Sequence, residues 1–204
     1  MEIGRGAEAV LIKEGNSLIK KRLSKGYRIK EIDSRLLKTR TKQEARLLER
    51  VHGRIKVPKI LYVNNEENTI AMEFIDGKKL ADYFDSFNRK EQEKICKLIG
   101  KEIALMHNED VIHGDLTTSN MILKNENVYL IDFGLGYVDD KIEPRAVDLH
   151  LLTQAFESKH YKFFKESIEI IFEEYKKHVK DAKKIFERLE KVEKRGRYKI
   201  KKEA

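Results

Sequence analysis

The chain of 204 residues contains one cysteine, two prolines and no tryptophan. The single Cys96 excludes a disulfide within the chain, and its place in an amphipathic helical pattern predicts a buried apolar thiol rather than a reactive one. No apolar run approaches the roughly 18 residues that a membrane span requires, and the N-terminus lacks a secretory hydrophobic stretch. We therefore expect a cytoplasmic protein without a membrane partner.

Charged residues are abundant, at 38% of the chain, and 43 Lys and Arg against 35 Asp and Glu give a net charge of +8. Such a balance favours an anionic partner such as nucleic acid, although basic proteins without one are common. The apolar fraction of 40% is sufficient for a core.

Hydrophobic patterns divide the chain near Gly77. Before it, two apolar runs around Gly15-Asn16 predict a hairpin, residues 32–53 a helix that stops at His52-Gly53, and residues 58–77 two further strands. After it, residues 79–87 and 89–109 read as helices, and residues 111–138 as a hairpin that turns at Asn125 to Asn127. From Arg145 to near Lys194 the pattern is helical again, and we expect the last residues to fray.

A group of polar residues interrupts the predicted hairpin. Its sequence has the form H-x-D-x4-N at His113, Asp115 and Asn120, followed by Asp-Phe-Gly at Asp132. In phosphoryl transfer an Asp orients or deprotonates the attacking oxygen, while an Asn and a second Asp hold Mg²⁺ against the phosphates. Alternatively these residues are only turn formers and caps, which each of them taken singly would favour. We interpret His113 as a packing residue.

The rest of a nucleotide site is predicted upstream. The loop from Gly4 to Ala9 could fold over phosphates through backbone N–H groups, although Ala9 replaces the third glycine of the usual pattern. Lys20 lies on the strand after the hairpin, where a lysine must reach the α- and β-phosphates; its neighbour Lys21 points to the opposite face.

Glu44 is placed on the predicted helix to pair with that lysine. Thr41-x-x-Glu44 also fits a capping box, in which Glu44 would serve only its own helix end. The strand that ends near Gly77 can offer backbone groups to an adenine edge, with Met72 lining the pocket or simply packing in the core.

Together these stretches resemble the protein-kinase fold over nearly the whole chain, and more narrowly the PRPK-type small atypical kinases, the kinase subunit of the KEOPS complex. The similar stretches are "GAEA", "IKKR" running on to "KGYR", "RTKQEARLL", "HGDLTTSN", "IDFGLG" and "AVDLHLLTQAF". The resemblance implies an α+β, two-lobed fold with a small antiparallel-sheet N-lobe carrying one main helix and a reduced, mostly helical C-lobe. It implies ATP and Mg²⁺ as cofactors, slow autophosphorylation or ATP hydrolysis, and support of threonylcarbamoyladenosine formation in tRNA. The implied partners are tRNA and other KEOPS subunits, including the threonylcarbamoyltransferase.

Carried over by position, the resemblance assigns roles to individual residues. Asp115, Lys20 and Glu44 are expected to be catalytic, Asn120 and Asp132 to bind the metal, and Asp148 to accept backbone N–H bonds from the catalytic loop. The expected nucleotide-binding residues are Gly4, Gly6, Ala7, Glu8, Ala9, Lys20, Met72, Glu73, Ile75, Asn120 and Asp132, with Glu73 and Ile75 offering a backbone carbonyl and N–H to adenine.

The chain departs from ordinary protein kinases in three places. Gly114 replaces the arginine that would clamp a phosphorylated activation loop. Only 13 residues, Leu135 to Val147, separate the Asp-Phe-Gly motif from Asp148, too few for a peptide-docking shelf. Thr117 stands where a lysine would contact the γ-phosphate, and losing that charge costs about a few kcal/mol of transition-state stabilisation. We expect slow turnover, with water a more credible acceptor than a general protein substrate.

Two basic and aromatic groups could contact tRNA, or could simply be solvated: Lys25 and Arg28 in one, and Arg195, Arg197, Tyr198 and Lys199 in the other. At the N-terminus only Met1 to Ile3 precede the glycine loop, so the first strand is short or the chain was cut from a longer fusion protein.

The predicted organisation is an N-lobe at 1–76, a C-lobe at 77–194 and a basic tail at 195–204. The leading functional hypothesis is an atypical Ser/Thr kinase or ATPase. The rivals are a RIO-like or small-molecule phosphotransferase, and a nucleotide-binding assembly module without turnover. The sequence specifies neither the phosphoryl acceptor, the oligomeric state nor the partner surfaces.

Overall fold

A computed structural model describes residues 1–6, 9–26 and 29–200, with only the backbone described for residues 30 and 196–200. The N-terminal part is one antiparallel sheet in the order β1-β2-β3-β5-β4. Its strands are β1 (Glu2–Arg5), β2 (Ala9–Glu14), β3 (Ser17–Arg22), β4 (Ile60–Asn64) and β5 (Thr69–Glu73). The predicted hairpin is confirmed, because Gly15 takes the positive φ of 57° that its tight turn requires. The first strand is short but formed.

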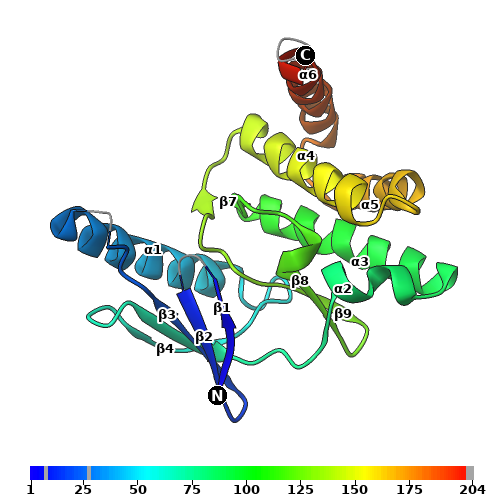
Figure 1. Ribbon diagram of the computed structural model, residues 1–204. Helices are drawn as coiled ribbons and strands as arrows, with labels where there is room; N and C mark the ends of the chain where they lie inside the picture. The colour runs from blue at the N-terminus through cyan, green and yellow to red at the C-terminus, as the bar shows by residue number, and fades with distance from the viewer. Residues whose placement is uncertain (7–8, 27–28, 201–204) are drawn as a thin grey trace.

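A single long helix, α1 (Lys30–Val51), packs along this sheet (Figure 1). Leu37, Leu47, Leu48 and Val51 form its buried face, spaced as a helix of 3.6 residues per turn requires. The predicted stop is confirmed, since His52 leaves the helical conformation and Gly53 has a φ of 83°. The helix begins well before Thr41, so the capping-box interpretation of Thr41 and Glu44 is wrong.

The second part is mostly helical. Its helices are α2 (Leu80–Tyr83), η1 (Phe84–Ser86), α3 (Arg89–Asn108), η2 (Thr118–Asn120), α4 (Ile142–Lys159), α5 (Phe164–His178) and α6 (Ala182–Ile200). Its short strands are β6 (Lys78–Lys79), β7 (Val111–Ile112), β8 (Met121–Lys124), β9 (Asn127–Leu130) and β10 (Tyr137–Val138). They form the sheets β6-β8-β9 and β7-β10. The predicted turn between β8 and β9 is confirmed, with positive φ at Asn125 and Glu126. The helical pattern does not end near Lys194 as expected, since the backbone stays helical to Ile200.

The core of this part lies between α3 and α5, which contact each other closely, and α6 packs on α4 (Figure 1). Gly100 of α3 lies so near α5 that a Cβ on it would be 2.4 Å from the Ile171 carbonyl oxygen. Cys96 is buried, and burial raises the pKa of its thiol to about 12, which confirms the apolar role predicted for it. Among the described helices, none combines the length and apolarity that crossing a membrane requires.

The small antiparallel sheet with one main helix, joined to a larger helical part, is the predicted two-lobed kinase-like fold. The chain passes from β5 to β6 through residues 74–77, beside which the predicted lobe boundary lies. The loops that carry Asp115 and Asp132 lie opposite residues of β2 and β3.

Candidate active site

A cavity of about 330 Å³ lies between the two lobes. Its described lining residues come from the loop after β1, from β2 and from β3 on one side, and from the loops after β7 and β9 on the other: Gly6, Ala9, Leu11, Lys20, Arg22, Asp115, Asp132, Gly134 and Leu135. Residues more than 100 positions apart in the sequence thus share one polar cleft.

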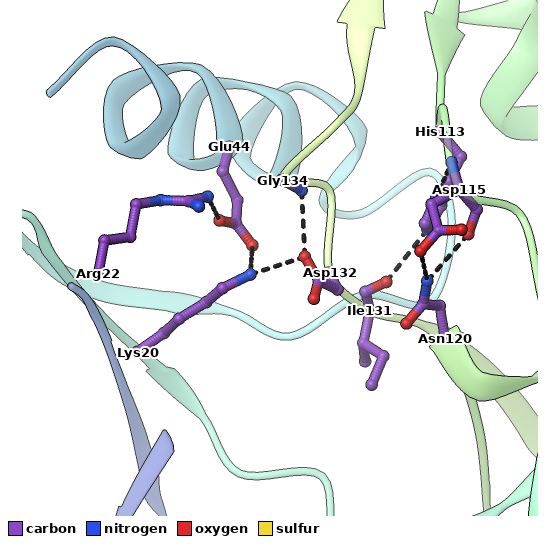
Figure 2. Close-up of polar contacts among 9 residues, drawn as sticks. All are labelled: Lys20, Arg22, Glu44, His113, Asp115, Asn120, Ile131, Asp132 and Gly134. Atoms are coloured by element: carbon purple, nitrogen blue, oxygen red, sulfur yellow. Dashed lines mark hydrogen bonds and ion pairs between the residues drawn. The ribbon is translucent and has the colours of Figure 1, made fainter. Parts of the chain in front are cut away.

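Lys20 joins the two lobes. Its Nζ donates to Glu44 Oε1 and to Asp132 Oδ1, each at 2.7 Å, and Figure 2 shows the ammonium group lying between these carboxylates. Burial alone would lower the pKa of Lys20, but the two carboxylates outweigh burial and raise its pKa. Burial alone would raise the pKa of Asp132, but the attraction of Lys20 outweighs burial and lowers that pKa. Lys20 is a cation and Asp132 an anion at neutral pH.

Lys21 takes the opposite face, as the strand alternation predicts. It is exposed and lies 4.0 Å from Glu67. Lys20, and not Lys21, is thus the lysine that pairs with Glu44, as predicted.

Glu44 binds a second cation, which the sequence analysis missed. Arg22 donates from Nη2 to Glu44 Oε2, and both side chains are almost fully buried. The available signal was the period of two along β3, which puts Arg22 on the same face as Lys20. Thr41 donates its hydroxyl to the Leu37 carbonyl oxygen at 2.8 Å within the helix, so it caps nothing.

Asp115 and Asn120 stand together at the other side of the cleft. The Asn120 amide Nδ2 donates to the Asp115 backbone oxygen and to Asp115 Oδ2, both at 2.9 Å (Figure 2). Because the nitrogen is used in this way, the Oδ1 atom of Asn120 remains as an acceptor or metal ligand. Asp115 is exposed at the cavity.

His113 is buried and its contacts are structural, as predicted. Its Nε2 lies 3.1 Å from the Ile131 carbonyl oxygen, and its ring packs on Phe133 with centroids 4.7 Å apart. Asp148 accepts from the backbone N–H of His113 at 2.7 Å and of Gly114 at 2.9 Å, which confirms its predicted contacts. The loop that presents Asp115 is therefore tied to α4.

A buried histidine that the sequence analysis missed supports Asp148. His107 Nε2 lies 3.3 Å from Asp148 Oδ2, and its Nδ1 lies 2.7 Å from the Tyr175 hydroxyl oxygen. Burial outweighs the attraction of Asp148 and lowers the pKa of His107, so the ring is neutral.

A second buried histidine that the sequence analysis missed is His160. It bridges Asp85 and Thr118, at 2.7 Å and 3.0 Å, and thereby holds the turn before Asn120 in place.

Position 114 requires a glycine for a steric reason as well. Its φ is 77°, and a Cβ there would lie 2.4 Å from the Leu135 carbonyl oxygen. The segment after the Asp-Phe-Gly motif therefore runs directly over the loop that carries Asp115. It pairs as β10 with β7 and reaches α4 after three more residues, which agrees with the predicted lack of a docking shelf.

Asp132 has a left-handed backbone with a φ of 61°, which for a residue other than glycine costs on the order of 1 to 3 kcal/mol. The Gly134 N–H donates to its Oδ1 at 3.2 Å. This geometry aims the carboxylate at Lys20 and the cavity.

The donor set fits magnesium held together with phosphates, rather than by the protein alone. Within the described ranges no cluster of three or more His, Cys, Asp and Glu could hold a metal ion. Asn120 Oδ1 and the Asp132 carboxylate are hard oxygen donors, and Mg²⁺ in nucleotide sites needs one or two such ligands besides phosphates and waters. ATP and Mg²⁺ thus fit the residues present.

The structure does not bring every predicted nucleotide residue to the cavity. Met72 packs in the core. Met72, Glu73, Ile75 and Asn120 lie outside the described lining, although Asn120 bonds the lining residue Asp115. Gly4 belongs to β1, and the Gly6 N–H donates to the Ala9 carbonyl oxygen at 2.9 Å instead of pointing freely into the cleft. Ala7 and Glu8 lie outside the described residues.

The residues predicted to contact tRNA are only partly described. The Lys25 backbone N–H donates to Asp33 Oδ2 at 3.0 Å, which orders that loop against α1. Arg195 lies 3.0 Å from Glu143, leaving much of its side chain exposed. Arg28 and the side chains of Arg197, Tyr198 and Lys199 fall outside the described residues.

Comparison with protein families matches residues 15–149 to the RIO domain. Among curated proteins, the KEOPS complex subunit Bud32 of Pyrococcus abyssi is 42% identical over 184 residues, which is 89% of this chain and 84% of that protein. Probable bifunctional tRNA threonylcarbamoyladenosine biosynthesis proteins of Methanococcus vannielii and Methanobrevibacter smithii are each 41% identical over 96% of this chain. This chain spans only 36% of the length of those two.

Among solved structures, WaaP in complex with acyl carrier protein matches with a TM-score of 0.67. The match covers 98% of this chain and 87% of that one, at 11% sequence identity. At this identity the likeness supports the fold alone.

Proposed function

The chain belongs to the Bud32 family of RIO-domain proteins, and from that premise we propose that it binds Mg²⁺ and ATP in the interlobe cavity as an atypical kinase or ATPase. The observation that carries the proposal is the bonding of Lys20 to both Glu44 and Asp132 beside Asp115. Lys20 would bind phosphate oxygens, with Glu44 fixing its position. Asn120 and Asp132 would hold the metal, which supplies charge neutralisation at the transferred phosphoryl group.

Asp115 is proposed as the group that orients the attacking oxygen and accepts its proton. Its exposure at the cavity and the Asn120 amide beside it support this role. Protein kinase activity of the Ser/Thr type, including autophosphorylation, belongs to the proposal, with water as the main acceptor. The segment between Asp132 and α4 favours water as the phosphoryl acceptor, because it is too short to form a peptide-docking shelf.

We further propose that this ATP chemistry supports threonylcarbamoyladenosine formation in tRNA, in a KEOPS assembly with its threonylcarbamoyltransferase and other subunits. The names of the Pyrococcus and Methanococcus relatives support this step. The expected setting is the cytoplasm.

The test is Mg²⁺-dependent ATP hydrolysis by the chain, with and without tRNA and partner subunits. We expect slow basal turnover that rises with tRNA and partners, and a smaller rise after deletion of residues 195–204. Rapid stoichiometric phosphorylation of a sugar, an antibiotic or a ribosomal protein without tRNA would instead identify a different phosphotransferase. Binding of ATP without turnover under every condition would indicate an assembly module.

A further inference from the structure

Helix α1 carries a row of cations on its outer face: Arg35, Lys38, Lys42 and Arg46, here called the α1 basic stripe. All four side chains are exposed. At about 100° per residue they fall within a sector of about 80°, over roughly 16 Å of helix. Glu44 lies about half a turn away, on the buried face. The helix therefore presents its catalytic carboxylate inward and the stripe to solvent.

The stripe lacks partners among the residues that the structure describes. None of its four residues has an ion pair or hydrogen bond with any residue in the described ranges. Glu31 and Glu49 occur on the same face only at its two ends. Like charges four residues apart, as at Lys42 and Arg46, cost an isolated helix about 0.2 to 0.5 kcal/mol per pair. Helix stability therefore does not account for the stripe.

We propose that the α1 basic stripe binds the phosphate backbone of RNA. Cations three and four residues apart on one helix face form a straight row at a spacing comparable with successive phosphates of a nucleic acid strand. The net charge of +8 adds long-range attraction for such a polyanion. In taking RNA as the polyanion, the inference rests on the proposed function.

An anionic membrane is the less suitable occupant. A helix that lies on a membrane inserts an apolar face beside its basic one. The apolar face of α1, with Leu37, Leu47 and Leu48, is already buried in the small lobe, and Ile32 in the first turn is the exposed exception. The stripe is thus suited to a water-soluble polyanion.

The test is binding of a labelled tRNA transcript to the full chain, by fluorescence anisotropy at several salt concentrations. The variant is Lys42→Ala with Arg46→Ala, and the matched control is Lys97→Ala with Lys101→Ala, two exposed lysines with the same spacing on α3. Each lost phosphate contact should weaken binding about eightfold at 0.1 M salt and lower the salt slope by about one. We expect the stripe variant to lose about 60-fold in affinity and about two in slope, and the control to change little.

Equal affinities and slopes for the two variants would overturn the inference, as would wild-type binding to phosphatidylserine vesicles through the stripe without tRNA binding. Thermal unfolding checks that both variants fold. ATP turnover without tRNA is the separate readout, since the stripe touches no part of the cavity and its loss should leave basal turnover unchanged. Absent turnover in the wild-type chain would instead count against the proposed function.

Discussion

The two sides of the interlobe cavity hold their charges in opposite ways. On the N-lobe side Lys20, Arg22 and Glu44 are all buried and already paired with one another. On the C-lobe side Asp115 is exposed, and the Asp132 side chain is 52% exposed, with only part of its oxygen capacity used. The fold therefore fixes the first group completely, whereas the second retains oxygen atoms for a ligand.

This contrast separates positioning from binding. A buried ion pair adds little net stability, because desolvation offsets the attraction, but removing one partner is costly. An exposed carboxylate can be changed with little effect on folding. Substitutions on the N-lobe side should thus affect stability and activity together, and those on the C-lobe side activity alone.

The largest expected effect is on the exposed side. Asp132→Ala removes a proposed metal ligand, and a loss of several kcal/mol of transition-state stabilisation lowers ATP turnover about a thousandfold or more. Asp115→Asn keeps the bond to Asn120 and should lower turnover about a hundredfold. Steady-state hydrolysis measures both. Urea unfolding should show a smaller loss of stability than Glu44→Ala, because Lys20 keeps its bond to Glu44 in both variants. A loss of stability in either variant as large as that of Glu44→Ala would contradict the difference between the two sides of the cavity.

The buried side should respond in stability. Glu44→Ala removes the carboxylate that the buried Lys20 and Arg22 share, and should cost about 3 to 5 kcal/mol of unfolding free energy. Lys20→Met leaves Glu44 paired with Arg22, so it should cost clearly less while still lowering turnover. Urea denaturation of the two variants compares them directly. Equal losses would mean that Arg22 does not hold Glu44 by itself.

The contact of the two cleft loops can be tested at Gly114. Gly114→Ala places a Cβ against the Leu135 carbonyl oxygen and strains a positive φ, which should cost about 1 to 3 kcal/mol. Gly26→Ala is the control, because none of the described residues would lie within 4 Å of a Cβ there. Gly114→Ala should have a lower melting temperature than Gly26→Ala. Equal melting temperatures would show that the two loops can move apart at little cost.

The smallest effect is on pH dependence. Because the folded-state pKa of His107 is lowered below 6.5, the unfolded chain takes up the proton more readily. The stability contributed by neutral His107 is full above pH 6.5 and is lost as the pH falls through 6.5 toward the folded-state pKa. The slope is at most about 1.4 kcal/mol per pH unit. His107→Gln should flatten the melting temperature between pH 7 and 5, and an unchanged profile would assign the acid sensitivity to other groups such as His160.

Sequence patterns predicted those parts of the site that depend on local spacing. The alternation along β3 put Lys20 and Lys21 on opposite faces, and Lys20 was chosen because it directly follows the apolar pair. The D-x4-N pattern placed Asp115 beside Asn120. The pairing of Glu44 with Lys20 was also predicted and favoured, although the local pattern at Thr41 fitted a cap as well. The start of α1 at Lys30 and the bond of Lys20 to Glu44 decided between the two.

Contacts that depend on how distant elements pack could not be read from the chain. Arg22, His107 and His160 act through partners 22 to 75 positions away. No local pattern distinguishes the two histidines from ordinary polar residues, and the period of two along β3 gives only the face on which Arg22 lies. The steric need for Gly114 arises from Leu135, which the tertiary fold alone brings near. The predicted adenine contacts at Glu73 and Ile75 stay predictions.

A structure of the chain with Mg²⁺ and a non-hydrolysable ATP analogue tests the central claim most directly. We predict a metal ion about 2.1 Å from oxygens of Asn120 and Asp132, with phosphates within reach of Lys20 in the interlobe cavity. A nucleotide bound elsewhere, or a metal ion that contacts neither side chain, would contradict the account.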